Sequence, residues 1–222
     1  MMSSDVSNFE TRMVAELELY WLIHKHSMAK VINLPHAQSA LHAWKQEWES
    51  LFEQPRHQFL QMGYAFGQLL MYEQSLSNKS AAVREALLSE MLRLSTDIMR
   101  LATDTTDDRT QFLSDNVFHL ATFAAVTACR LLSRYQEELR ADSHLAGTDA
   151  VIANTIQWLD SIGLPSHIGH IMANVIRTVQ RRLRSEASTL APSTQKTSDG
   201  FGIPELLSAD FIDFDWDAIM PD

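Results

Sequence analysis

The sequence contains very little cysteine and glycine, and both shortages exclude structural classes. Cys129 is its only cysteine, so the chain can form neither an internal disulfide nor a cysteine-based zinc site. The 222 residues include seven glycines and few runs that alternate apolar with polar residues, which argues against a sheet-rich fold with many tight turns. A helical protein in a reducing compartment fits both shortages.

Signals for export and membrane insertion are also lacking. Residues 1–5 are polar and acidic and are not a basic segment that leads into an apolar run, so we expect no signal peptide. The longest apolar stretch lies between His119 and Arg130 and is expected to be too short to cross a hydrocarbon core of about 30 Å. We therefore expect no membrane association.

Positive charge is scarce. The formal net charge is −10, and an acidic surface repels phosphate backbones, so we expect no direct contact between this chain and nucleic acid. The charge is unevenly distributed, because residues 201–222 contain six acidic residues and no lysine or arginine. These six are Glu205, Asp210, Asp213, Asp215, Asp217 and Asp222.

Apolar residues recur at steps of three and four over most of the chain, which is the pattern of amphipathic helices. The predicted fold is all-α: a bundle of about seven helices around a central apolar helix, followed by a disordered acidic C-terminal tail. The central helix is residues 116–132, which have no clear polar face. We divide the chain into a helical domain at 1–184, a flexible linker at 185–203 and the tail at 204–222. The other predicted helices are 7–31, 38–52, 56–73, 81–102, 148–162 and 166–183.

Three of these helices carry packing predictions. In the first, one stripe is predicted to face the core: Phe9, Met13, Leu17, Tyr20, His24, Met28 and Val31. In the third, Gly63 and Gly67 lie one turn apart and predict the close approach of another helix, since glycine otherwise costs helix stability, and an irregular turn is the alternative. In the helix predicted at 81–102, apolar residues recur with a 4-3-4-3 spacing. This spacing fits a face buried in the bundle better than a dimerisation zipper, and homodimer formation stays open. Its members are Leu87, Met91, Leu94, Ile98 and Leu101.

No residue constellation supports catalysis or a cofactor, so we expect a protein that is not an enzyme. His167 and His170 share a helix face without a third ligand; we predict helix capping for His167 and packing for His170. Cys129 is predicted to be an inert small hydrophobe. The aspartates at 104–108 invite comparison with the magnesium sites of terpenoid cyclases, but acids are expected at a helix start and the chain is short for that fold.

A basic cluster ends the last predicted helix, at Arg177, Arg181, Arg182 and Arg184. Cations in the last turns of a helix complement its dipole, and this is the favoured interpretation. A phosphate-binding patch and a contact with the acidic tail are the alternatives.

The tail is the most specific feature of the sequence. Its aromatic and aliphatic residues alternate with aspartates, whose like charges keep the large apolar groups solvated and available to a partner. If the segment became helical, its apolar and acidic residues would lie on opposite faces, which suits a hydrophobic groove with a basic rim. This composition is typical of transcriptional activation segments, and a tail docked on its own bundle is the alternative. The predicted partner-binding residues are Phe211, Ile212, Phe214, Trp216, Ile219, Asp213 and Asp217.

Three stretches resemble fungal zinc-cluster (two-zinc, six-cysteine) transcription factors. Residues 41–49 are similar to the Leu-x-x-Trp-x-x-x-Trp helix of their regulatory domains, which makes Leu41, Trp44 and Trp48 the core of the motif. Residues 112–126 resemble the polar start and the Ala/Phe-rich body of their central helix. The third stretch is the acidic-aromatic tail. Regulators of extracellular proteases or of leucine biosynthesis are the nearest members.

The resemblance implies a nuclear regulator with a zinc-binding, cysteine-rich DNA-binding module, a coiled coil, a helical regulatory domain and a C-terminal activation region. This chain has one cysteine and no coiled-coil segment, so we expect the later part of the regulatory domain plus the activation tail. It would be a fragment, or a protein that acts without its own DNA contact. The implied partners are coactivator proteins at the tail, with DNA and zinc bound only by a separate or missing module. The alternative is a non-catalytic helical scaffold or metabolite-sensing bundle with an internally docked tail.

Overall fold

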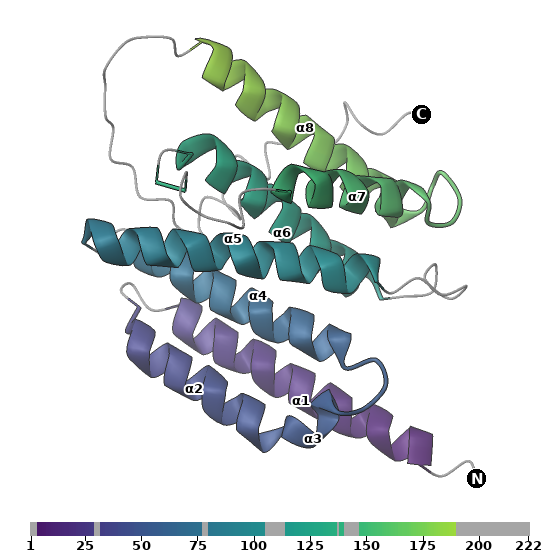
Figure 1. Cartoon of the computed structure of the whole chain (residues 1–222). Coiled ribbons are helices and arrows are strands. Elements are labelled where there is room, and N and C mark those ends of the chain that lie inside the picture. Colours follow the sequence, from purple (N-terminus) through teal and green to yellow (C-terminus); the bar gives the residue numbers. More distant parts are fainter. Residues whose placement is uncertain are drawn as a thin grey trace.

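Helices make up the part of the chain that the structure describes (Figure 1). This computed structural model describes residues 4–28, 32–76, 80–104, 114–136, 138–139 and 147–189, and no strand occurs in these ranges. The predicted all-α fold is confirmed. The elements are α1 (Ser4–Ser27), α2 (Leu34–Glu47), α3 (Glu49–Phe52), α4 (Gln58–Ser75), α5 (Ala81–Thr103), α6 (Asp115–Arg134), α7 (Thr148–Asp160) and α8 (Ile168–Thr189).

The segment predicted as one helix at 38–52 begins earlier and is divided. Asn33 caps α2 by accepting a hydrogen bond from the backbone N–H of His36 at 3.2 Å. Pro35 lies in the first turn, where backbone N–H groups have no partner within the helix, so the missing N–H of proline costs no helical hydrogen bond. Trp48 leaves the helical conformation (φ −101°, ψ 15°) and separates α2 from α3. The described ranges therefore contain eight helices, where about seven were predicted.

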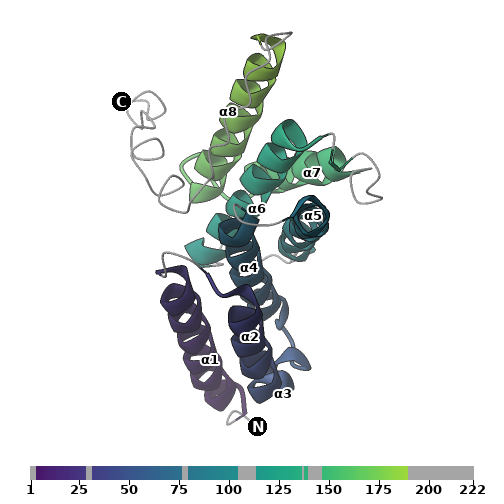
Figure 2. The ribbon, with the colours of Figure 1, turned by 90° about the vertical axis from the view of Figure 1, so that its left-hand side faces the viewer.

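The helices pack mostly against neighbours in the sequence. At one end of the molecule α1 and α2 pack on α4, and α4 packs on α5 (Figures 1 and 2). At the other end α6 packs between α5 and α8, and α7 contacts α5, α6 and α8. This order places α6 in contact with most of the bundle, as its apolar sequence predicts.

The centre of α6 is built from small side chains. Ala121, Ala124, Ala125 and Ala128 have no exposed surface, so neighbouring helices can pack close to the α6 backbone. With 20 residues, α6 is the one helix in the described ranges that is long and apolar enough to cross a membrane. The expectation that this stretch is too short was therefore wrong. Burial of 67% of its most apolar window inside the bundle is what a core helix shows.

The prediction of which α1 residues face the core is wrong. The residues that face the core are Ala15, Leu19 and Ile23, which recur at four-residue steps and are buried. Most of the predicted stripe is exposed, including Leu17 at 65% and Met28 at 67%. Because α1 is apolar on two sides, its spacing alone could not identify the side that faces the bundle.

The predicted role of the α4 glycines is confirmed. A Cβ atom at Gly63 would lie 3.1 Å from Leu19 Cδ2, and one at Gly67 would lie 2.9 Å from Ile23 Cδ1. The two glycines therefore leave the room into which the inner face of α1 packs.

The regularly spaced apolar residues of α5 face the core of the bundle, which is the interpretation that the sequence favoured. Met91, Leu94 and Ile98 are buried in the core, while Leu87 and Leu101 are partly buried against it. None of these five side chains is left free for a zipper with a second chain.

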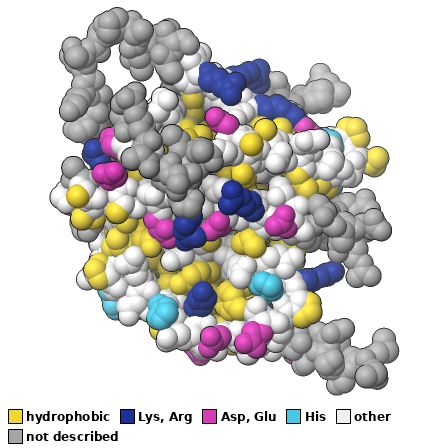
Figure 3. Space-filling model, viewed as in Figure 1, with side chains coloured by type: hydrophobic (Ala, Val, Ile, Leu, Met, Phe, Trp, Pro, Cys, Tyr) yellow, Lys and Arg dark blue, Asp and Glu magenta, His cyan; other side chains and the backbone are white. Residues whose placement is uncertain are grey.

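The basic cluster does not end a helix. Because α8 continues to Thr189, its last turn contains no basic residue, and the predicted dipole interaction is wrong. Arg177 forms an ion pair with Asp160 at the end of α7, and the Arg181 Nη2 atom donates to Thr178 Oγ1 at 3.2 Å. Lysine and arginine side chains gather over α8 on the face shown in Figure 3.

We predict that Gly67→Leu lowers the free energy of unfolding by about 1–3 kcal/mol, because the new side chain overpacks the contact with Ile23 and separates α1 from α4. Urea unfolding followed by circular dichroism measures the change. Ala43→Leu, which adds a similar bulk at an exposed position of α2, is the matched control and should unfold like the wild type. Equal midpoints for Gly67→Leu and the wild type would contradict the close approach.

Candidate functional site

The motif Leu-x-x-Trp-x-x-x-Trp lies at the end of α2 and fastens α1 to the bundle. Leu41 and Trp44 are buried, and Trp48 is half-buried. Trp44 Nε1 donates a hydrogen bond to the carbonyl oxygen of Ala15 at 3.0 Å, and Trp48 Nε1 donates to Glu18 Oε2 at 3.0 Å. Both acceptors belong to α1, so the motif joins two helices that are separate in sequence.

Trp44 is also the centre of an aromatic cluster. Its ring stacks on Tyr64 of α4 at 6.1 Å between centroids and meets Phe52 of α3 edge-on at 6.0 Å. The Lys45 ammonium lies 5.2 Å from the centroid of the Tyr64 ring, within the range of a cation–π interaction. The motif therefore connects α1, α2, α3 and α4.

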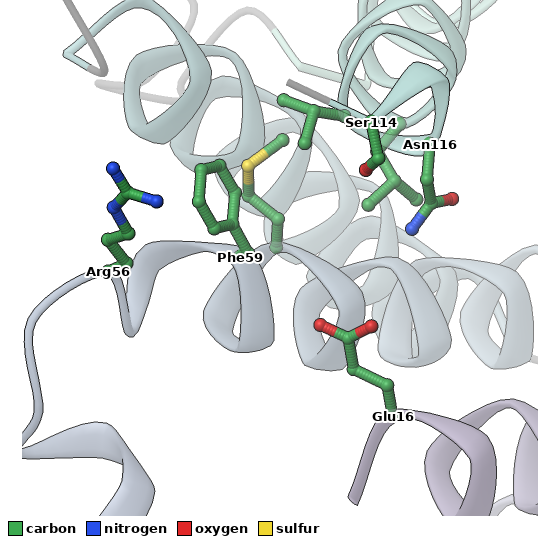
Figure 4. A pocket seen from close by; sticks show the side chains of 8 residues that line it. Glu16, Arg56, Phe59, Ser114 and Asn116 are labelled. Carbon is green, nitrogen blue, oxygen red and sulfur yellow. The ribbon is translucent and has the colours of Figure 1, made fainter. Parts of the chain in front are cut away.

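A hollow between α1, α4 and the start of α6 brings polar groups together (Figure 4). Its volume is about 210 Å³, below the 300–1,000 Å³ typical of ligand pockets. The lining residues are Glu16, Arg56, Phe59, Met62, Ser114, Asn116, Val117 and Leu120. A space of this size suits a small polar molecule.

The electrostatics of the hollow come from groups that are distant in sequence. Burial raises the pKa of the Glu16 carboxyl, and the Arg12 guanidinium opposes this shift. Asn116 Nδ2 donates to the Tyr20 hydroxyl at 2.7 Å, and burial raises the pKa of Tyr20. Sequence reasoning did not find this hollow, because no local motif links residues 16, 56 and 116.

Glu73 on α4 is the one charged residue buried in the described part of the chain, with 7% of its surface exposed. Burial raises the pKa of its carboxyl to about 7, although the Arg130 guanidinium of α6 acts in the opposite direction. Burial also lowers the pKa of Arg130. The carboxyl is therefore poised between its neutral and charged forms near neutral pH.

The histidine predicted to cap a helix does so. His167 Nδ1 accepts a hydrogen bond from the backbone N–H of Gly169 at 3.0 Å, so His167 caps α8. His170 is half-buried, with Nδ1 3.9 Å from Asp160 Oδ1. Among the described residues, no group of three or more His, Cys, Asp or Glu side chains could hold a metal ion.

Two further predicted groups can be placed in part. Cys129 is buried in α6, and burial raises the pKa of its thiol to about 11, so the thiol stays protonated at neutral pH. Asp104 lies exposed at the end of α5 rather than at a helix start, which corrects the prediction. Asp107 and Asp108 lie outside the described residues, as do the predicted tail residues Phe211, Ile212, Asp213, Phe214, Trp216, Asp217 and Ile219.

We predict that Trp44→Phe lowers the free energy of unfolding more than Trp48→Phe does. The first change removes a buried hydrogen bond worth about 1 kcal/mol and leaves a gap beside Tyr64, whereas the second removes a solvent-exposed contact with Glu18. Leu164→Ala, at a 74% exposed position between α7 and α8, is the control and should have little effect. Urea unfolding ranks the three variants, and the opposite order for the two motif tryptophans would refute the prediction.

We predict that Glu73 makes the protein less stable as pH rises from 4.5 to 7.5. Its carboxyl titrates near 4.5 when unfolded and near about 7 when folded, so between these values the folded state binds more protons. At about 1.4 kcal/mol per pH unit, Glu73→Gln should gain up to about 3 kcal/mol on the wild type over this range. Urea unfolding at several pH values measures the difference. Glu53→Gln, at an exposed position, should follow the wild type, and a Glu73→Gln profile parallel to the wild type would disprove the prediction.

Comparison with protein families connects this architecture to gene regulation. The family model described as the middle domain of prtT, a transcriptional activator of proteases, matches residues 1–183. Comparisons with curated proteins and with solved structures gave no match. The matched range includes α1 to α7 and most of α8, and with them the tryptophan motif and the polar hollow. The chain therefore belongs to the family of prtT-like transcriptional activator middle domains.

Proposed function

We propose that the chain regulates transcription in the nucleus as the regulatory and activation part of a fungal zinc-cluster transcription factor, and that it acts through protein partners without catalysis. The family match over residues 1–183 carries this proposal, since the family is named for a transcriptional activator. An acidic-aromatic segment follows the matched range in the same chain.

The charge of the chain supports a role without direct DNA contact. A net charge of −10 opposes the approach of a phosphate backbone. The single cysteine is buried in α6 and cannot contribute to a six-cysteine zinc cluster. DNA recognition and zinc binding would therefore belong to a separate cysteine-rich module.

The tail would contact coactivators. Aspartates separate Phe211, Phe214 and Trp216, and their repulsion keeps the aromatic side chains from clustering with one another. A coactivator groove with an apolar floor and a basic rim would accept both kinds of residue. The cost of ordering a flexible segment would keep the affinity modest, which suits an exchangeable partner.

The helical domain would serve as the scaffold. The tryptophan motif joins α1 to the rest of the bundle, and the hollow beside Glu16 and Arg56 offers space for a small polar effector. The hollow is the observation that favours the second candidate function, a metabolite-sensing bundle.

We predict that residues 204–222, fused to a heterologous DNA-binding domain, activate a reporter gene several-fold above the DNA-binding domain alone. Phe211→Ala combined with Trp216→Ala should remove most of this activation, because it deletes two large apolar contacts and keeps every charge. Ser208→Ala combined with Pro221→Ala is the control that leaves the aromatic residues intact. Immunoblots confirm equal expression. Absence of activation, or activation unaffected by the double aromatic change, would rule out the activation role of the tail.

A further inference from the structure

One long apolar surface of the bundle has no described element packed on it. It lies on α1 and consists of Phe9, Met13, Val14, Leu17, Trp21 and Met28, whose exposures range from 47% to 69%. We name this surface the outer face of α1. In Figure 2, α1 lies at the edge of the bundle, with α2 and α4 on one side of it.

The outer face lies opposite the face that packs on α4. At about 100° per residue, its members cover an arc of about 140° around Leu17. Leu19, in the middle of the buried inner face, points to the opposite side of the helix. At about 1.5 Å per residue, the stripe from Phe9 to Met28 is roughly 28 Å long.

The outer face is large for a surface left in water. With about 150–200 Å² for each large apolar side chain, the measured exposures leave on the order of 600 Å² of apolar surface. The largest apolar patch of a typical monomer is about 300–600 Å². Two such faces buried together would cover about 1,200 Å², the lower limit for a specific interface.

We propose that the outer face of α1 binds the same face of a second copy of this chain, with the two α1 helices antiparallel and Leu17 on the twofold axis. In that register residue i faces residue 34 − i of the partner. Met13 would face Trp21, a favourable sulfur–aromatic pair.

The polar residues within the stripe select the antiparallel register. Glu10 and His24 are exposed and lie inside the arc of the outer face. In the antiparallel pair each Glu10 faces His24 of the other copy. The carboxylate of Glu10 can then accept a hydrogen bond from the His24 ring on both sides of the axis. A parallel pair would instead place Glu10 beside Glu10, and like charges at close range are destabilising.

A second copy also fits the charges better than the acidic tail does. The first half of α1 carries the exposed Glu10 and Glu18, which would repel a segment that contains six acids and no cation. An antiparallel copy brings its own basic end, with His24, Lys25 and His26, to this acidic end. The proposal rests on the described bundle and does not depend on the proposed role in transcription.

Analytical ultracentrifugation of the full chain over a concentration series tests the pairing. The wild type should form a dimer, and Leu17→Glu should raise its dissociation constant at least tenfold, while the circular dichroism spectrum stays unchanged because Leu17 is exposed. Leu164→Glu is the matched control, since Leu164 is a 74% exposed leucine in the turn between α7 and α8. A monomeric full chain, or a dimer that Leu17→Glu leaves intact, overturns the proposal. Dimers that form only after deletion of residues 204–222 would likewise overturn it and assign the outer face to the tail.

Charge exchange tests the register independently of any loss of apolar contact. His24→Glu should weaken the dimer because it places a second carboxylate opposite Glu10, and Glu10→Lys should weaken it because it removes the acceptor that faces His24. The two changes combined should restore most of the wild-type affinity. A combined variant weaker than both single variants overturns the antiparallel register.

Disulfide trapping distinguishes the two orientations directly. In a Cys129→Ala background, a mixture of Glu10→Cys and His24→Cys chains should form a covalent heterodimer on mild oxidation, and neither chain alone should cross-link efficiently. A parallel dimer would give the reverse result. Since both positions are exposed and lie outside the core, these variants should keep the wild-type fold.

Discussion

The packing of other helices around the alanines of α6 is the constraint on which the bundle depends. Ala121, Ala124, Ala125 and Ala128 extend little beyond the backbone, so α5 and α8 can lie close to α6 along its length. A larger side chain at any of these positions would push a neighbour outward. At the other end of the molecule α4 also has small residues at a helix contact, because Gly63 and Gly67 leave room for α1. Small residues on two central helices therefore set the spacing of the bundle.

The sequence predicted those parts of the fold that local patterns determine. The apolar body of α6 identified the central helix, and paired glycines one turn apart identified a close helix contact. The side of α1 that faces the bundle was not predictable, because Leu17 and Leu19 are equally apolar and only tertiary contacts distinguish them. The separation of α3 at Trp48 was likewise not predicted, and Trp48 contacts Glu18 of α1. Nor was the continuation of α8 past its arginines predicted. No sequence pattern could assemble the polar hollow, whose residues come from three distant segments.

Polar groups inside the bundle specify its arrangement more than they strengthen it. The Trp44 indole N–H can be satisfied by the Ala15 carbonyl only when α1 lies in one position relative to α2. The Arg130 guanidinium of α6 attracts the Glu73 carboxylate of α4, and the raised pKa of the carboxyl shows that the cost of burial outweighs this attraction. Such groups disfavour alternative packings of helices that are otherwise bound by non-directional apolar contacts.

Because Cys129 is buried, the rate at which its thiol is alkylated can report how often the bundle opens. A protonated, enclosed thiol reacts with alkylating reagents only in molecules whose bundle has opened around α6. Because the chain has no second cysteine, the alkylation rate would report a single site without any engineered label. When opening is fast and reversible, that rate gives the free energy of exposing the central helix. Cys129 thus makes the opening of the core measurable in the unmodified protein.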